Sequence, residues 1–266
     1  MKRLLLMFFM TLNCMFAAAS VVDSSTHVLL GLNGGAGVGV YRDEGLSPLL
    51  YRGLEIHPSI SVEVRNPLWR YEALVSIDGG AYGFTLSPTG FHAFGGQVSV
   101  AFNALQQVYS AGCWRLWAGV GIDDLFDIRC NPQFENASVG ASNFARLNVL
   151  ARAEVQMRGW LAWGHLGFTP VALLYRPGFA YMPNYERNIS NFVDCFFDQY
   201  HLYCAAATGI SSQLGVTRQL ANGNEFGLSY RWHHITSRST PDGVSAPYRF
   251  DQSSHALMVH FLFNIQ

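Results

Sequence analysis

The feature that most constrains this chain is a set of long segments in which polar and apolar residues alternate one by one. In segment 143–157, Arg146, Arg152 and Glu154 are among the polar residues at even positions, and apolar residues occupy almost all odd positions. Successive side chains of a β-strand point to opposite faces, so the pattern predicts strands with one polar and one apolar face. The alternation recurs in segments 54–65, 69–84, 91–105 and 113–128.

The length of these segments separates two kinds of β-protein. A soluble sandwich also alternates, but its strands have about five or six residues, whereas most segments here have about 11 to 16, enough to cross a bilayer at a tilt. In a membrane every backbone polar group must be paired within the protein, so a spanning sheet must close. We therefore predict an all-β fold, a closed antiparallel transmembrane β-barrel of about ten strands with a polar, filled lumen. The expected strands are 27–41, 54–65, 69–84, 91–105, 113–128, 143–157, 160–175, 204–218, 225–237 and 254–265.

The connections between the expected strands alternate in length. Short links at Asn66-Pro67, Arg158-Gly159 and 221–224 carry turn residues. Outer-membrane barrels have short periplasmic turns and longer external loops, which predicts that these three links face the periplasm. Long external connections are then expected at 42–53, 129–142, 176–203 and 238–253, with 85–90 as a shorter exception.

The N-terminus has the pattern of an export signal. Lys2 and Arg3 precede an apolar run, and Ala17 to Ala19 supply small residues for cleavage before Ser20. A membrane-spanning helix is the alternative, but the apolar run is too short for one. We predict a signal peptide at 1–19 and a barrel domain at 20–266, in the bacterial outer membrane. Outer-membrane lipid and lipopolysaccharide are the expected partners, and the long loops are available to an extracellular ligand.

Charged residues predict what fills the barrel. The formal net charge of -1 argues against nucleic acid as a partner, and the scattered histidines lack metal-ligand spacing, so no metal or cofactor is expected. Ten strands enclose a narrow interior, in which long charged side chains are expected to pair across the lumen. A plugged barrel is therefore favoured, and a narrow solute pore is the alternative. The predicted lumen network comprises Glu63, Glu72, Arg115, Arg146, Arg152, Glu154 and Arg231.

Four cysteines remain after signal removal, an even number in an oxidising compartment where disulfides persist. Cys113 and Cys130 lie at opposite ends of one expected strand, roughly 50 Å apart, which is too far for a bond. A Cys195–Cys204 disulfide is our first choice, and free thiols are the alternative.

One constellation near the C-terminus suggests chemistry. Strand parity places His234 and Thr236 on the lipid-facing side at the external end. A histidine two residues from a hydroxyl can act as its general base, and Asp251 could orient the imidazole, which makes these three the candidate catalytic residues. The alternative is that they are interfacial residues, since amphipathic side chains are favoured where lipid meets water.

Two resemblances bear on function. Segment 231–237 with Pro241-Asp242-Gly243 resembles the end of the lipid A deacylase family, which implies ester hydrolysis at the outer leaflet. Thr236 stands where that family has Ser, and no Glu follows it. The glycine-rich stretch 31–39, the passage 173–180 and the closing strand resemble uncharacterised outer-membrane barrels of Gram-negative bacteria, which implies a fold and a location without a reaction. The leading hypothesis is a non-enzymatic outer-membrane barrel, and a deacylase-like hydrolase and a narrow pore are the alternatives.

Overall fold

The computed structural model describes residues 26–44, 47–84, 93–132, 139–177, 200–203, 208–239 and 248–265. The predicted signal peptide, 1–19, and the predicted disulfide partners Cys195 and Cys204 lie outside these ranges. Most of the predicted external loops also lie outside them.

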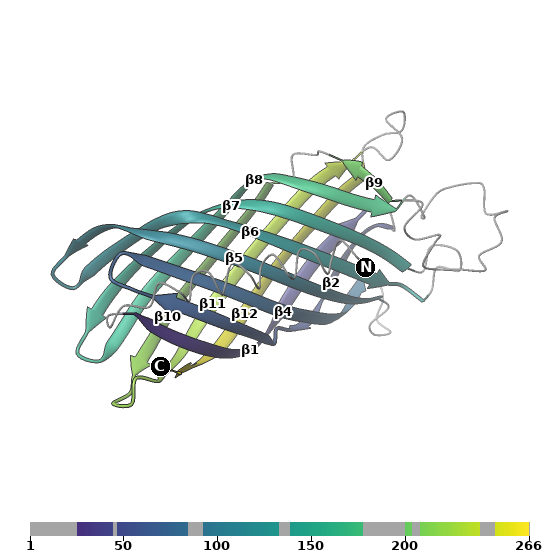
Figure 1. Ribbon diagram of the computed structural model, residues 1–266. Helices are drawn as coiled ribbons and strands as arrows, with labels where there is room; N and C mark the ends of the chain where they lie inside the picture. Colours follow the sequence, from purple (N-terminus) through teal and green to yellow (C-terminus); the bar gives the residue numbers. More distant parts are fainter. Residues whose placement is uncertain are drawn as a thin grey trace.

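The described residues form one closed antiparallel sheet (Figure 1). It closes because β1 pairs with β12, while β10 pairs with both β8 and β11. Segments β2 and β3 both lie between β1 and β4, and β9 and β10 both pair with β8, so the twelve segments make ten barrel strands, as predicted. The segments are β1 His27–Asp43, β2 Ser47–Ile56, β3 Ser59–Arg65, β4 Trp69–Phe84, β5 Ala93–Ala111, β6 Trp114–Cys130, β7 Val139–Met157, β8 Trp160–Pro177, β9 Tyr200–Tyr203, β10 Thr208–Gln219, β11 Glu225–Ser239 and β12 Tyr248–Asn264.

The second barrel strand is interrupted, where a single strand over 54–65 was expected. The break falls at His57 and Pro58, because proline has no N–H to donate to a neighbouring strand. The wall nevertheless stays continuous, since His57 N donates to Gly35 O and Ile77 N donates to Pro58 O, both at 3.0 Å. The break therefore leaves His57 in the wall with its side chain buried in the barrel.

Several strands extend further toward the external end than predicted. The prediction of long connections at 42–53, 129–142 and 238–253 was wrong, because the strands on either side continue into these ranges. The segments that remain between the strands are 44–46 between β1 and β2, 131–138 between β6 and β7, and 240–247 between β11 and β12. The added residues include Asp43 and Arg129, which resemble loop residues in sequence. Both side chains are buried inside the barrel, so the alternation of the strands continues through them.

The two faces of the wall differ as the alternation predicts. On β12 the inward residues Ala256, Met258 and Leu262 are buried, whereas outward Leu257 is 72% exposed. Outward residues from Leu257 to Ile265 are all apolar, and at about 3.4 Å per residue this stretch is roughly 27 Å long. Barrel strands tilt by about 40°, so this stretch spans roughly 21 Å along the membrane normal, close to the apolar band of about 25 Å in outer-membrane barrels.

Apolar clusters inside the barrel lie toward its two ends. Two clusters fill the external half: Leu125, Phe144, Leu174, Ile235 and Phe250 form one, and Tyr41, Tyr51, Tyr82 and Ala93 form the other. A third cluster, in the periplasmic half, comprises Leu105, Trp117 and Leu150. Charged and polar side chains occupy the lumen around and between these clusters.

Candidate functional site

A hydrogen-bonded layer joins opposite walls in the external half of the lumen. Arg129 on β6 is 1% exposed and donates from Nη2 to Gln252 Oε1 on β12 at 3.0 Å. Strands β5, β4, β2 and β1 separate β6 from β12, so this bond crosses the barrel. Gln97 on β5 completes the layer, donating to Gln252 Oε1 at 2.6 Å and to Asp127 Oδ1 at 2.7 Å.

Arg129 is hydrogen-bonded and stacked on several sides within this layer, while its Nη1 is buried without a hydrogen-bond partner among the described residues. Its Nε donates to Asp127 Oδ2 at 2.8 Å, and its guanidinium carbon lies 3.9 Å from the ring centroid of Tyr41. Phe250 lies on another side, with its ring centroid 5.3 Å from the same carbon. A buried cation stacked on aromatic faces and paired with a carboxylate is well compensated for its loss of water. We call Gln97, Asp127, Arg129 and Gln252 the external layer.

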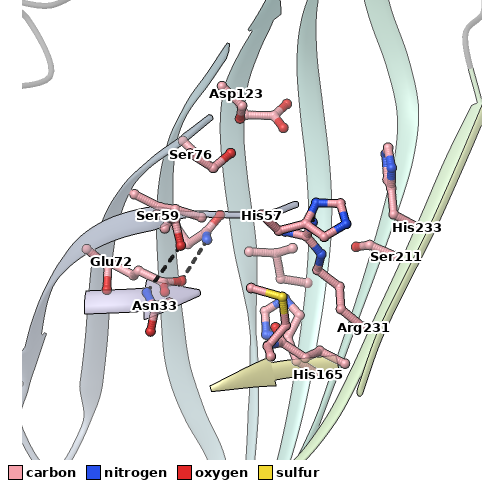
Figure 2. Close-up of a pocket in the computed structure, with 18 of the residues that line it drawn as sticks. Asn33, His57, Ser59, Glu72, Ser76, Asp123, His165, Ser211, Arg231 and His233 are labelled. Atoms are coloured by element: carbon pink, nitrogen blue, oxygen red, sulfur yellow. Dashed lines mark hydrogen bonds between the residues drawn. The ribbon is translucent and has the colours of Figure 1, made fainter. Parts of the chain in front are cut away.

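Near the middle of the barrel, His57 and Arg231 meet side by side (Figure 2). Arg231 Nη2 on β11 lies 2.6 Å from His57 Nδ1 and 3.5 Å from Asp78 Oδ2. His57 Nδ1 also lies 3.0 Å from Asp78 Oδ1, so this ring nitrogen faces both a guanidinium donor and a carboxylate acceptor. Within the described part of the chain, His57 Nε2 has no hydrogen-bond partner, and Glu55 Oε2 lies 3.6 Å away.

A second central group joins β6, β7 and β11. Arg146 on β7 forms an ion pair with Asp123 on β6, with Nε donating to Oδ1 at 2.8 Å. Its Nη1 lies 3.2 Å from His233 Nε2 on β11, which projects from the far side of the cavity in Figure 2. This group and the pair of Arg231 with His57 cross the lumen at the same part of the barrel.

An ion-pair network occupies the periplasmic half of the lumen. Arg70 on β4 donates to Glu154 Oε1 on β7 at 2.6 Å and to Glu63 Oε2 at 2.7 Å. Arg65 on β3 reaches Glu225 Oε1 on β11 at 2.8 Å, and Arg152 donates to Glu154 Oε1 at 2.7 Å. We call Glu63, Arg65, Arg70, Arg152, Glu154 and Glu225 the periplasmic layer.

The two remaining residues of the predicted lumen network lie beside the periplasmic layer. Glu72 accepts a hydrogen bond from Asn103 Nδ2 at 3.0 Å inside the barrel. The side chain of Arg115 is 38% exposed, and its Nε lies 3.7 Å from Glu154 Oε2, so it is at the mouth of the lumen. All seven residues of the predicted network therefore line the lumen or its mouth.

A cavity of about 260 Å³ remains among these bonded groups. Its lining includes Glu55, Glu63, Glu72, Asp78, Asp123 and Glu225 as carboxylates, and Arg65, Arg70, Arg146, Arg152 and Arg231 as guanidinium groups. The two sets nearly balance in charge, so the cavity has no strong preference for an ion of either sign. Within the described ranges, no three His, Cys, Asp or Glu side chains are placed to hold a metal ion.

The three candidate catalytic residues lie together on the outer wall, but they are not connected as a catalytic triad. Thr236 Oγ1 donates directly to Asp251 Oδ1 at 2.6 Å, and Asp251 also forms an ion pair with Arg249. His234 pairs in register with Ser253, and its ring stacks on Trp232 with 6.4 Å between centroids. A triad needs the imidazole between acid and hydroxyl, and here the acid bonds the hydroxyl itself.

Sequence reasoning missed the external layer because the expected strand ended before Arg129. Strand parity contained the signal: Asp123, Asp127 and Arg129 all occupy odd positions of β6, the same face that carries Arg115. The partners across the lumen, such as Gln252 for Arg129, depend on how the sheet curves and closes, which alternation along one strand does not encode.

Comparisons with known proteins give only distant similarities. No protein-family model matches the sequence, and no curated protein matches it. Among solved structures, the outer membrane protease OmpT from Escherichia coli has 7% identity and a TM-score of 0.46, covering 93% of this chain and 100% of that chain. The translocator domain of autotransporter NalP from Neisseria meningitidis has 8% identity and a TM-score of 0.42, covering 98% of each chain. The toluene transporter TodX from Pseudomonas putida has 7% identity and a TM-score of 0.28, covering 92% of this chain and 90% of that chain. At these values, none of the three indicates what this chain does.

Proposed function

We propose that this chain is an integral, non-enzymatic protein of the bacterial outer membrane, with a lumen closed to solutes and with its external connections as its binding surface. The observation that carries the proposal is the bonding across the lumen, between opposite walls at the external layer and between strands separated by two others at the centre and at the periplasmic layer. The apolar outer wall supports the membrane location, because a closed sheet is the form in which strands cross a bilayer.

The buried ion pairs argue against the narrow-pore alternative. A solute passing through the lumen would have to separate Arg129 from Gln252 and Arg70 from Glu154. Arg129 would keep its ion pair with Asp127, and Glu154 its ion pair with Arg152, so each separation costs the loss of a hydrogen bond to a charged group, about 1.5–3 kcal/mol. Two such layers in series oppose passage, although the cavity between them has room for water.

Conductance across a planar lipid bilayer tests the closed lumen. We expect the full-length protein to insert without producing current steps. The double variant Arg70→Ala with Arg129→Ala removes one cation from each layer, and we expect it to conduct. The matched control is Arg218→Ala, because Arg218 lies on the outer wall against Trp160 and takes no part in the lumen. Regular current steps from the unaltered protein would refute the closed lumen.

A further inference from the structure

Outward-facing residues on β11 and β12 change from apolar to polar toward the external end. On β12 the apolar stretch ends at Leu257, and on β11 it ends at Leu228. Above these positions the outward residues of the two strands are polar or aromatic: Tyr230, Trp232, His234 and Thr236 on β11, and Arg249, Asp251, Ser253 and His255 on β12. On the two next strands one arginine each faces outward near this end, Arg42 above Val40 on β1 and Arg52 between Leu50 and Leu54 on β2.

An aromatic and imidazole row marks the boundary between the two zones. Tyr230 Oη lies 2.6 Å from His255 Nδ1, and Trp232 Nε1 donates to Ser253 Oγ at 3.1 Å. The rings of Trp232 and His255 are 6.4 Å apart between centroids. Trp and Tyr with one apolar and one polar end favour the level where acyl chains meet headgroups. Side chains above this row therefore lie at headgroup level.

Arg42 and Arg52 are cations near this boundary for which the described ranges of the chain supply no partner. Val40 pairs in register with Arg52, so Arg42, two residues further along β1, is a diagonal neighbour of Arg52 on the same face. Among the described residues, neither guanidinium has an ion pair or a hydrogen bond, and Arg42 Nε is buried without an acceptor. The terminal nitrogens of Arg42 and the exposed guanidinium of Arg52 are therefore the donors that an external anion can reach.

The nearby carboxylates are already engaged. Asp251 lies opposite Arg42 in register, but it pairs with Arg249 and accepts from Thr236. Glu44 accepts a hydrogen bond from Arg249 N at 3.0 Å. Arg249 and Asp251 neutralise each other, and Glu44 keeps its charge beside Arg42, so Arg42, Arg52 and Glu44 leave a formal excess of one positive charge at this site.

We propose that Arg42 and Arg52 form a binding site for a phosphate group of lipid A, in the lipopolysaccharide of the outer leaflet. The inference rests on the proposed outer-membrane location. Guanidinium groups bind phosphate through paired, charge-assisted hydrogen bonds, and two of them side by side suit a dianionic group. Lipid A also supplies acyl chains, which would lie against the apolar wall directly below, at Val38 and Leu54.

Binding of lipid A to the purified full-length protein in detergent tests this site. We expect the protein to bind bis-phosphorylated lipid A, and Arg42→Gln with Arg52→Gln to weaken binding at least about tenfold, given the strength of charge-assisted hydrogen bonds. The control is Arg158→Gln with Arg218→Gln, which removes two cations from the opposite end and should leave binding unchanged. Heat-dependent electrophoretic mobility would verify that each variant is folded.

Three comparisons of ligand make the outcome decisive. Dephosphorylated lipid A and phosphatidylglycerol should each bind at least about tenfold more weakly than bis-phosphorylated lipid A. Inorganic phosphate alone should not compete at equal concentration, because it lacks the acyl chains. Equal binding of any of these three, or unchanged binding by the double variant, would overturn the inference. A protein that inserts into bilayers without conducting, yet fails to bind lipid A, would refute this site and leave the proposed function intact.

Discussion

Replacing Arg129 by methionine should destabilise the barrel strongly, because it leaves a buried carboxylate without a cation. Asp127 is 2% exposed and keeps only the amide of Gln97 when Arg129 is removed. Leaving such a charge uncompensated costs about 3–5 kcal/mol in the free energy of unfolding. Methionine fills much of the arginine volume, so the loss reports the charge more than the packing.

A second substitution separates charge from packing. In the double variant Arg129→Met with Asp127→Asn, the external layer carries no charge, and the asparagine can still bond Gln97. We expect the double variant to recover at least about 2 kcal/mol relative to the single variant. Urea unfolding in lipid vesicles, followed by tryptophan fluorescence, measures both values, and Arg218→Met on the outer wall should stay within about 0.5 kcal/mol of the unaltered protein. A single variant that loses less than about 1 kcal/mol, or a double variant less stable than the single, would refute the reasoning.

Three further predictions concern the wall, the outer surface and the cysteines. Gly37→Val should block folding, because a Cβ at this position of β1 would lie 2.0 Å from His255 O on the paired strand β12. Gly34→Val should fold, since a Cβ there would have no atom within 4 Å, and heat-dependent electrophoretic mobility distinguishes folded from unfolded protein. Lipid A should keep its mass when it is incubated with the unaltered protein or with the His234→Ala variant. Loss of an acyl chain with the unaltered protein but not with the variant would instead support a hydrolase. Cys195 and Cys204 should resist alkylation until reduced, as peptide mass spectrometry would show, and modification without reductant would contradict the predicted disulfide.

The barrel wall was predictable from sequence because the alternation of polar and apolar residues within each strand indicates which of its faces is buried. Arg146, Arg152 and Glu154 share one parity on β7, and the structure buries the same face inside the barrel. The positions at which strands end were less predictable, because Asp43 and Arg129 are charged and so resemble loop residues. They continue the strands because the lumen supplies partners for buried charge, and those partners come from distant parts of the chain.

The contacts of the candidate site depend on register between strands, which alternation does not specify. Parity placed His234 and Thr236 on the outer wall, where the structure has them, whereas Asp251 was expected in a loop and lies on β12. The pairing of β11 with β12 then sets Thr236 opposite Asp251 and His234 opposite Ser253. A shift of two residues would keep every side chain on the same face and change all of these partners. The missing link between His234 and Thr236 was therefore not available from sequence.

The central claim is that one face of every strand meets lipid and the other is buried in a closed lumen. Nitroxide labels placed singly at positions 257 to 261 of β12, in a protein with its native cysteines replaced by serine and inserted into lipid vesicles, test this directly. We predict that collision with oxygen, which concentrates in lipid, is high at Leu257, Val259 and Phe261 and low at Met258 and His260. Uniform values along the strand, or greater access of a water-soluble nickel complex at the odd positions, would contradict the account.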